Sequence, residues 1–242
     1  MNHPVRHIRS YVRREGRITD GQQQALEKHW GKYGIDFNET RLDLDVIFNR
    51  PAPKILDIGS GMGDTTIALA QQHPENDYLA VEVHRPGVGS LLRQVELNNL
   101  RNIRVSNHDV VEVLQYQVPE NSLDSVYIFF PDPWPKKRHH KRRLVNSPFL
   151  QLLGERLKGN ARIFIATDWA DYAGQVLQVF RQSPGYFNLA GEGRTSPRPR
   201  WLPRTRFEQR GHNHHHSIWN FIFARRADPG SSGAPGKHLE FI

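Results

Sequence analysis

An aspartate held between two prolines and followed at once by positive charge carries the clearest chemistry in this sequence. Residues 129–135 read Phe-Phe-Pro-Asp-Pro-Trp-Pro, so Asp132 and Trp134 come directly after an apolar run that is typical of a buried parallel strand. The prolines forbid continuation of the strand. We therefore expect both side chains at its carboxyl end, the edge at which open α/β sheets bind ligands.

The cationic segment, residues 136–143, contains six Lys or Arg residues and two His residues. Such a density of positive charge suits a polyphosphate and would repel itself without a partner. A solvated charged loop is the alternative interpretation. Because the segment follows Asp132 and Trp134 directly, we favour the hypothesis that acid and cations belong to one site.

A glycine-rich turn, Leu-Asp-Ile-Gly-Ser-Gly-Met-Gly-Asp at residues 56–64, predicts a nucleoside site. Gly59 and Gly61 let the backbone approach a ligand, and Glu82 at the end of the next strand can accept both ribose hydroxyls. A dinucleotide fingerprint would need a third glycine where Asp64 stands. An acid there opposes a pyrophosphate but suits a sulfonium, so the predicted cofactor is S-adenosylmethionine.

Acids at three successive strand ends support this cofactor. Asp57, Glu82 and Asp109 each follow or end a predicted strand. Each acid taken alone could cap a helix instead, and Asp109 directly before Val110 fits an N-cap. Both interpretations of Asp109 stay open at this point.

Strands alternate with helices along the chain, which predicts an α/β fold with a doubly wound, mostly parallel, Rossmann-like sheet. A change of pattern after residue 185 predicts an antiparallel C-terminal strand pair, with a functional loop at 191–211 between its members. The expected parallel strands are 54–58, 78–83, 103–106, 125–130 and 162–167, the expected helices are 64–72, 86–97, 110–116, 145–157 and 170–181, and the antiparallel pair is 186–189 with 217–224.

The domain organisation that we expect has three parts. A basic N-terminal arm covers residues 1–30, a methyltransferase domain covers 31–226, and a Gly-, Ser- and Pro-rich tail that we predict to be disordered covers 227–242. The arm is interpreted as an RNA clamp, with a solvated terminus as the alternative. Its arginines are Arg6, Arg9, Arg13, Arg14 and Arg17.

The composition of the chain limits the kinds of partner that we expect. The chain has 33 Lys and Arg residues against 25 Asp and Glu, a net charge of +8, which favours an anionic macromolecule over a small substrate. We expect no membrane span and no secretory signal, because no long apolar run is present. The absence of cysteine fits a cytoplasmic protein. The histidines at 212–216 are interpreted as a solvated loop, and no metal site is expected.

These motifs together resemble the bacterial tRNA (guanine-N7)-methyltransferases, from about residue 6 to residue 225. The resemblance implies transfer of a methyl group from S-adenosylmethionine to nitrogen-7 of a guanosine in the variable loop of tRNA. It rests on residues 8–17, the turn at 56–64, and residues 82–89, 129–143, 166–169 and 205–211.

The resemblance also implies residue roles. Asp132 lies at the catalytic centre between cofactor and base. The family often has Glu where this chain has Asp57. The implied cofactor contacts are Asp57, Glu82, Asp109 and Asp132, beside the turn glycines Gly59 and Gly61; the substrate contacts are Lys136, Asp168, Thr205, Arg206, Phe207 and Glu208; the RNA contacts are Arg138, His139, His140, Lys141, Arg142 and Arg143.

The residues fit this reaction without the resemblance. Guanine N7 has an in-plane lone pair and no proton, so its attack on a sulfonium methyl needs alignment rather than a strong base. A carboxylate, Asp132 or Asp168, can stabilise the positive charge that develops on the ring or accept from the base's Watson–Crick donors. The division of these roles stays open, as does the choice between Trp134 as a base-stacking and as a wall residue.

Two rival functions and the assembly state complete the expectations. One rival is a methyltransferase of the same fold acting on another RNA or on a small amine. The other is a non-catalytic RNA-binding protein or chaperone, which the intact acids and the Pro-Asp-Pro-Trp run disfavour. We expect tRNA as the partner, no obligate protein partner, and a monomer or homodimer.

Overall fold

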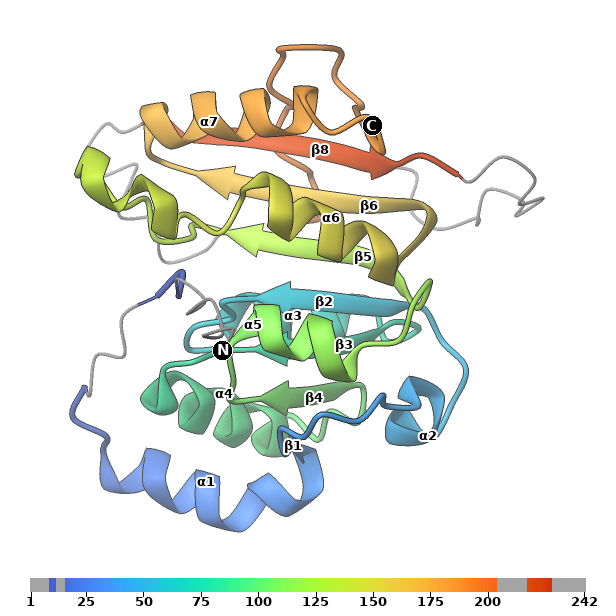
Figure 1. Ribbon diagram of the computed structural model, residues 1–242. Coiled ribbons are helices and arrows are strands. Elements are labelled where there is room, and N and C mark those ends of the chain that lie inside the picture. The colour runs from blue at the N-terminus through green and yellow to red at the C-terminus, as the bar shows by residue number, and fades with distance from the viewer. Residues whose placement is uncertain (1–8, 12–15, 204–216, 228–242) are drawn as a thin grey trace, which may run out of the picture.

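The computed structural model describes residues 9–11, 16–203 and 217–227, which contain one eight-stranded sheet in the order β1-β4-β3-β2-β5-β6-β8-β7 (Figure 1). Strands β1 to β6 pair in parallel, and β8 runs antiparallel to both β6 and β7. The predicted fold class and C-terminal strand pair are confirmed. The strands are β1 Gly34–Ile35, β2 Lys54–Ile58, β3 Asp77–Val81, β4 Ile103–Ser106, β5 Leu123–Phe129, β6 Leu157–Thr167, β7 Tyr186–Asn188 and β8 Trp219–Arg225.

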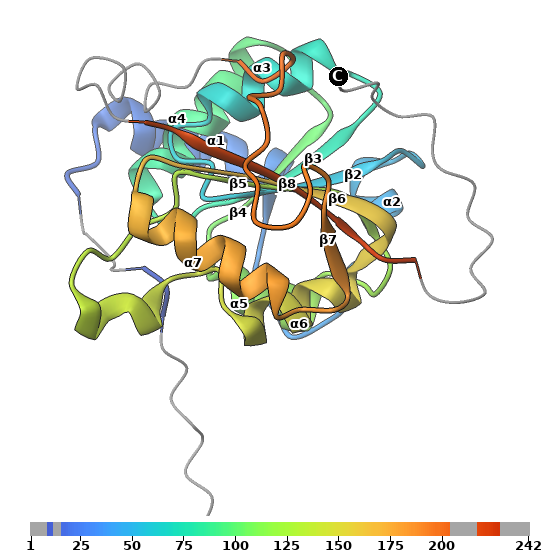
Figure 2. The ribbon, with the colours of Figure 1, turned by 90° about the horizontal axis from the view of Figure 1, so that it is seen from above.

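Helices cover both faces of the sheet (Figure 2). Successive residues of a strand point to opposite faces, so Ile55 joins one core cluster while Leu56 and Ile58 join the other. The first cluster holds α1 Asp20–Tyr33, α3 Asp64–Gln72 and α4 Arg85–Leu97, and the second holds α2 Leu44–Phe48, α5 Val110–Glu112, α6 Ser147–Arg156 and α7 Ala170–Arg181.

Helix α1 crosses the boundary that we expected at residue 30 between the N-terminal arm and the methyltransferase domain. A capping box joins Thr19 and Gln22 at its start. The helix packs on α4, where the Gln22 amide donates to the Ser90 hydroxyl at 3.0 Å and a Cβ atom at Gly89 would lie 2.6 Å from the Gln22 carbonyl oxygen. The chain from Asp20 onward is therefore part of the packed domain, and only residues before it can form an arm.

Several other expected boundaries differ from the structure, and three of them have a visible local cause or irregularity. The helix expected at 145–157 begins at Ser147, because the Asn146 side chain accepts from the Phe149 amide at 3.0 Å and caps it. Strand β6 begins at Leu157 rather than at residue 162, with a register irregularity opposite Leu123 and Ser125. The helix expected at 110–116 is the short α5, continued by a π-helical turn, Val113–Gln117.

Three expected segments fall partly or wholly outside the described residues, as do Arg6, Arg13 and Arg14 of the expected N-terminal arm. Within the loop expected at 191–211, Trp201 packs against Tyr127 and Phe164 with ring centroids 5.5 and 5.1 Å away, and Ser196 bridges to Asn220. Residues 204–211 of that loop, the histidines at 212–216 and the tail from 228 onward lie outside the described part of the chain.

Candidate active site

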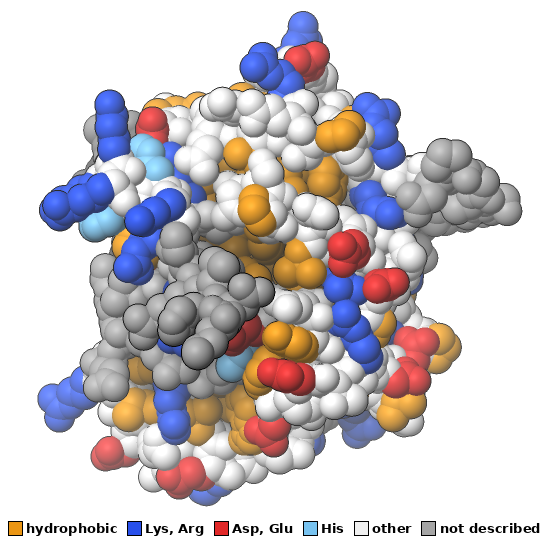
Figure 3. Space-filling model, viewed as in Figure 1, with side chains coloured by type: hydrophobic (Ala, Val, Ile, Leu, Met, Phe, Trp, Pro, Cys, Tyr) orange, Lys and Arg blue, Asp and Glu red, His pale blue; other side chains and the backbone are white. Residues whose placement is uncertain are grey.

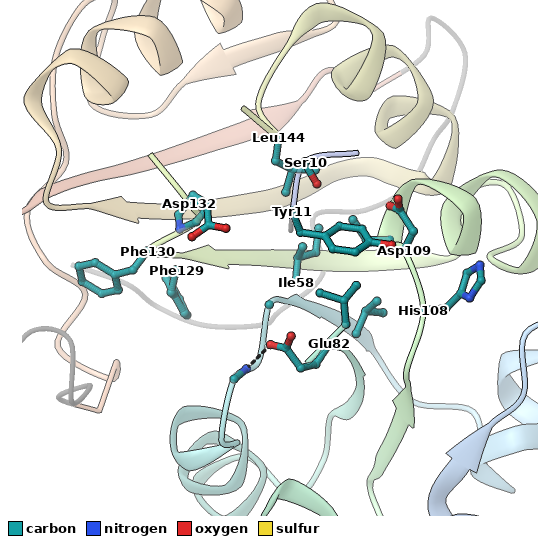
Figure 4. A pocket seen from close by; sticks show the side chains of 16 residues that line it. Ser10, Tyr11, Ile58, Glu82, His108, Asp109, Phe129, Phe130, Asp132 and Leu144 are labelled. Carbon is teal, nitrogen blue, oxygen red and sulfur yellow. Dashed lines mark hydrogen bonds between the residues drawn. The ribbon is translucent and has the colours of Figure 1, made fainter. Parts of the chain in front are cut away.

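A cavity of about 260 Å³ lies at the carboxyl ends of four adjacent parallel strands (Figure 4). Its walls come from the segments that follow β2, β3, β4 and β5, which is the edge predicted from the sequence. Leu144 and two residues of the N-terminal segment, Ser10 and Tyr11, complete it. The strand-end residues that line it are Ile58, Gly59, Gly61, Val81, Glu82, Val83, His108, Asp109, Val110, Phe129, Phe130, Pro131 and Asp132.

Glu82 is fixed in this cavity by two main-chain donors. One carboxylate oxygen accepts from the amide of Gly61 and the other from the amide of His84, each at 2.8 Å. The side chain is 8% exposed. Each carboxylate oxygen can accept a further hydrogen bond. Glu82 is therefore held in one orientation and can still accept hydrogen bonds from the hydroxyl groups of a ligand.

The glycine turn approaches α4 closely at this point. Gly61 has a φ of 58°, which favours glycine. A Cβ atom at Gly87 would lie 2.5 Å from the Gly61 carbonyl oxygen and 3.4 Å from the Glu82 side chain. The narrow cradle therefore requires glycine on the helix as well as on the turn, a requirement that we did not assign to Gly87 from the sequence.

Asp57 is not among the residues that line the cavity, and its role as a direct cofactor contact stays a prediction. Its side chain is buried and accepts from the Thr66 hydroxyl at 2.5 Å. Burial raises the pKa of Asp57 to about 6, and the Thr66 hydrogen bond opposes that rise. The strand is buried on both faces here, so the carboxyl group secures the start of α3 under the turn.

Asp109 caps a helix and also lines the cavity, so its position is compatible with both of the interpretations that the sequence left open. Its side chain accepts from the Val111 amide at 3.0 Å and caps α5, and the residue also lines the cavity. His108 beside it stacks on Phe37, with ring centroids 3.7 Å apart. The helix cap holds the carboxylate at the cavity wall.

Asp132 lies in the strand-end loop, residues 130–135, and is exposed at the cavity edge. Phe130 and Trp134, on either side of it, have φ values of 51° and 47°. Non-glycine residues rarely adopt this region, and it persists only where surrounding contacts hold it. The loop that presents Asp132 is thus a strained segment held from outside.

Trp134 stacks on a protein side chain and anchors the N-terminal segment. Its indole nitrogen donates to the Ser10 carbonyl oxygen at 2.9 Å. The Arg142 guanidinium lies 5.0 Å from the ring centroid, and His139 meets the ring edge-on at 5.8 Å. Neither the base-stacking nor the simple wall interpretation included these contacts.

The cationic segment forms a 3-10 helix, Lys137–Arg142, beside the strand-end loop. Lys136, Lys137, Arg138 and Lys141 are exposed. In Figure 3, Lys, Arg and His side chains gather over this segment, at the left of the view. Desolvation and the neighbouring cations lower the pKa of His139, with Arg138 the first of those cations. The described segment is an exposed basic surface next to the cavity.

Arg143 is the exception within that segment. Its side chain is 1% exposed, and its guanidinium is bonded inside the protein. The prediction that Arg143 contacts RNA stays untested, but the structure does not favour it, because a buried side chain with protein partners is not presented to a phosphate.

The remaining predicted site residues lie outside the cavity lining or outside the described part of the chain. Asp168 directly follows β6, the strand that pairs with β5, so it lies at the same sheet edge as Asp132 but outside the cavity lining. Lys136 is exposed and also outside the lining. The predicted contacts from Thr205 to Glu208 lie outside the described residues.

The lining of the cavity fits S-adenosylmethionine. Three acids line it, and no Lys or Arg is among the described lining residues. Such a wall suits a positively charged sulfonium and a ribose, and it would repel a pyrophosphate. Glu82 and the cradle between Gly61 and Gly87 provide the acceptors and the close backbone approach that a nucleoside needs. Among the described residues, no three potential metal ligands converge.

The fold and the site define a methyltransferase of the S-adenosylmethionine-dependent class with a Rossmann-like sheet. A family model described as "Putative methyltransferase" matches residues 51–221. A tRNA (guanine-N(7)-)-methyltransferase of Nitrosospira multiformis is 53% identical over 92% of this chain and 96% of that protein. The enzyme with that name from Hydrogenovibrio crunogenus is 46% identical over 91% of this chain and 92% of its own. The chain belongs to the tRNA (guanine-N7)-methyltransferase family.

Solved structures agree on the fold. An aminoglycoside resistance methyltransferase aligns with a TM-score of 0.51 at 15% identity, covering 78% of this chain and 95% of that chain. An antibiotic related methyltransferase aligns with a TM-score of 0.50 at 14% identity, covering 75% and 90%. At this identity the likeness concerns the sheet and its helices alone.

Proposed function

We propose that this protein methylates nitrogen-7 of a guanosine in tRNA, with S-adenosylmethionine as the methyl donor. The observation that carries the proposal is the placement of Asp132: it edges the acid-lined cavity on one side and adjoins the exposed cationic segment on the other. The relatives at 46–53% identity carry the name of this activity. We place the target in the variable loop on the family resemblance.

The cavity residues would hold the donor. Glu82 would accept from the ribose hydroxyls, and the turn at Gly59 and Gly61 would lie against the nucleoside. The acids Asp109 and Asp132 make the electrostatic environment favourable for positive charge. When bound, S-adenosylmethionine supplies an electrophilic methyl group.

The chain's own residues have to position a base rather than activate it. The N7 lone pair of guanine needs no proton removed, so effective alignment supplies most of the rate. Asp132 would stabilise the positive charge that develops on the purine ring. Asp168, one strand over and outside the cavity, would accept from the Watson–Crick donors that distinguish guanine from adenine.

The exposed cations would hold the RNA backbone. Arg138 and Lys141 of the 3-10 helix are exposed to solvent, as a phosphate contact requires. We propose that the protein is a monomer or a homodimer with no obligate protein partner. We propose that it acts in the cytoplasm, where tRNA is modified.

The proposal is tested by nucleoside analysis. Purified protein is incubated with a tRNA transcript and S-adenosylmethionine. The RNA is then digested, and the nucleosides are separated and identified by mass spectrometry. We expect 7-methylguanosine in the wild-type reaction and at least a tenfold slower single-turnover formation with Asp132→Asn, about 1.4 kcal/mol in barrier. A different methylated nucleoside, or none, would reject the function. A variant within threefold of wild type would move the charge-stabilising role to Asp168.

No helix among the described residues is long and apolar enough to cross a membrane.

A further inference from the structure

Arg143 ends the cationic segment, yet its side chain turns into the protein. The residue is 1% exposed, whereas Arg138 and Lys141 before it are exposed. A guanidinium keeps its charge at any ordinary pH, so its burial is tolerated only with a complete set of partners. The role of Arg143 therefore depends on the groups that its guanidinium contacts.

The partners of Arg143 come from three separate segments. From the strand-end loop, the Pro133 carbonyl oxygen accepts from Nε at 2.8 Å. From α7, the Gln175 side chain accepts from one terminal nitrogen at 2.7 Å and the Asp171 carboxylate from the other at 2.6 Å. From the 3-10 helix, His140 Nε2 lies 3.1 Å from that second nitrogen.

The ion pair between Arg143 and Asp171 lies partly in solvent. Arg143 is 1% exposed and Asp171 is 62% exposed. The hydrogen bond from Arg143 lowers the pKa of Asp171. The guanidinium also lies 5.0 Å from the centroid of the buried Tyr172 ring. The fork of the guanidinium, rather than its charge alone, matches this set of partners.

Pro133 directly follows Asp132, so the hydrogen bond to its carbonyl oxygen fixes the backbone that carries the acid. That backbone is strained, with positive φ values at Phe130 and Trp134. A strained loop relaxes when an outside contact is removed. Arg143 supplies such a contact from a buried position, where Asp171 and Gln175 of α7 hold its guanidinium.

We propose that Arg143 is a positioning residue, which holds the Pro133 carbonyl and thereby keeps Asp132 in the geometry needed for methyl transfer. It does not contact RNA phosphate. This inference rests on the proposed function for its kinetic readout, while the state of the loop can be measured without it.

The test compares Arg143→Lys with Arg156→Lys. The first keeps the positive charge but loses the fork that reaches Pro133, Gln175 and Asp171 together. The second makes the same change at another buried arginine, 3% exposed, which is paired with Glu120 and Glu155 away from the cavity. Both variants remove contacts of a buried guanidinium, so a general loss of stability affects both.

We expect Arg143→Lys to slow single-turnover methyl transfer at saturating tRNA by at least tenfold, with S-adenosylmethionine affinity and the salt dependence of tRNA binding unchanged. Hydrogen–deuterium exchange of peptides that cover residues 129–136 should become faster. Arg156→Lys should change neither the rate nor that exchange. Asp171→Asn, an exposed change that leaves the core packed, should slow transfer in the same direction and add less than its full effect to Arg143→Lys.

Two results would overturn the inference. One is a folded Arg143→Lys protein, or Asp171→Asn where the first does not fold, with a transfer rate within twofold of wild type and unchanged exchange in 129–136. The other is a fall of about 0.7 to 0.9 in the slope of log affinity against log salt for Arg143→Gln, which removes the charge; that fall would make Arg143 a phosphate contact. If the wild type forms no 7-methylguanosine, the proposed function fails, and the exchange measurement alone still decides the role of Arg143.

Discussion

The indole nitrogen of Trp134 donates a hydrogen bond to the Ser10 carbonyl oxygen at 2.9 Å, across 124 positions of sequence. Ser10 and Tyr11 line the cavity. The indole ring of Trp134 also contacts the guanidinium of Arg142, which belongs to the cationic segment. One side chain thus connects the N-terminal segment, the strand-end loop and the basic surface.

The first prediction separates the hydrogen bond of Trp134 from its ring. Trp134→Phe keeps an aromatic face for Arg142 but loses the N–H donor to Ser10. We expect S-adenosylmethionine binding to weaken by about 0.5–1.5 kcal/mol, the contribution of one hydrogen bond, because the Ser10–Tyr11 wall opens more often. Calorimetric titration measures the change.

The matched control is Trp30→Phe, which also removes an indole hydrogen bond, at 2.8 Å to Asp36 on the α1 side. That variant should bind the cofactor like the wild type. Equal affinities for Trp134→Phe and wild type would show that the N-terminal segment does not close the cavity.

The second prediction concerns Glu82. Glu82→Ala removes the acceptor of the Gly61 and His84 amides as well as the proposed ribose contact. We expect cofactor affinity to fall by about 1.5–3 kcal/mol, the range of a charge-assisted hydrogen bond. Titration of the variant beside Glu75→Ala, an acid that is 49% exposed in the turn before β3, measures it; unchanged affinity in folded Glu82→Ala would remove Glu82 from the site.

The third prediction is a pH dependence caused by Asp57. Burial raises the pKa of this carboxyl group to about 6 in the folded protein. A raised folded-state pKa means that its contribution to stability is present below the unfolded value near 4 and is lost as the pH rises through 6. The loss amounts to about 3 kcal/mol between pH 4 and pH 7.

Asp57→Asn cannot ionise, so its free energy of unfolding should improve relative to wild type over that window. Urea unfolding at several pH values measures the difference. Thr66→Val removes the hydrogen bond that opposes the pKa rise, and should therefore extend the wild-type loss to higher pH. A constant difference between Asp57→Asn and wild type from pH 4 to pH 7 would contradict this account.

The fourth prediction addresses RNA binding. Replacing Arg138, Lys141 and Arg142 with Ala should weaken tRNA binding and reduce the slope of log affinity against log salt by about 2 to 3 units, while cofactor affinity is kept. Arg143 is left in place because it is buried. Filter binding of one tRNA at several salt concentrations gives the slope.

A control variant for net charge replaces Arg101 and Lys158 with Ala. These residues lie near the amino ends of β4 and β6, at the opposite edge of the sheet. The slope for this control variant should stay at the wild-type value. If the triple variant also keeps that value, the cationic segment is a solvated surface, the alternative that the sequence allowed.

Much of the sheet and its ligand-binding edge could be predicted from the sequence, because local patterns determine them. β2 and α3 begin and end where the apolar periodicity and the glycine turn predicted. Helix α1 was missed although Thr19 and Gln22 form a capping box, because its apolar face is weak and the arginines before it dominated the interpretation.

The side-chain placements within the site that the sequence did not indicate have a different cause. Asp57 and Arg143 have the residue types that a cofactor or RNA contact would use, but the fold turns both side chains inward. Side-chain direction depends on packing against α3 and α7, which residue type does not encode. The same reason hid Ser10 and Tyr11, whose place at the cavity depends on a contact with distant Trp134.

The central claim, methylation at nitrogen-7 of guanine, is tested most directly with a tRNA transcript in which 7-deazaguanosine replaces guanosine. Carbon stands at position 7 of that base, so the lone pair that attacks the methyl group is absent while the Watson–Crick edge is retained. We predict that the modified transcript binds with an affinity close to that of normal tRNA and accepts no methyl group from S-adenosylmethionine. Methyl transfer to the 7-deazaguanosine transcript at the normal rate would contradict the claim.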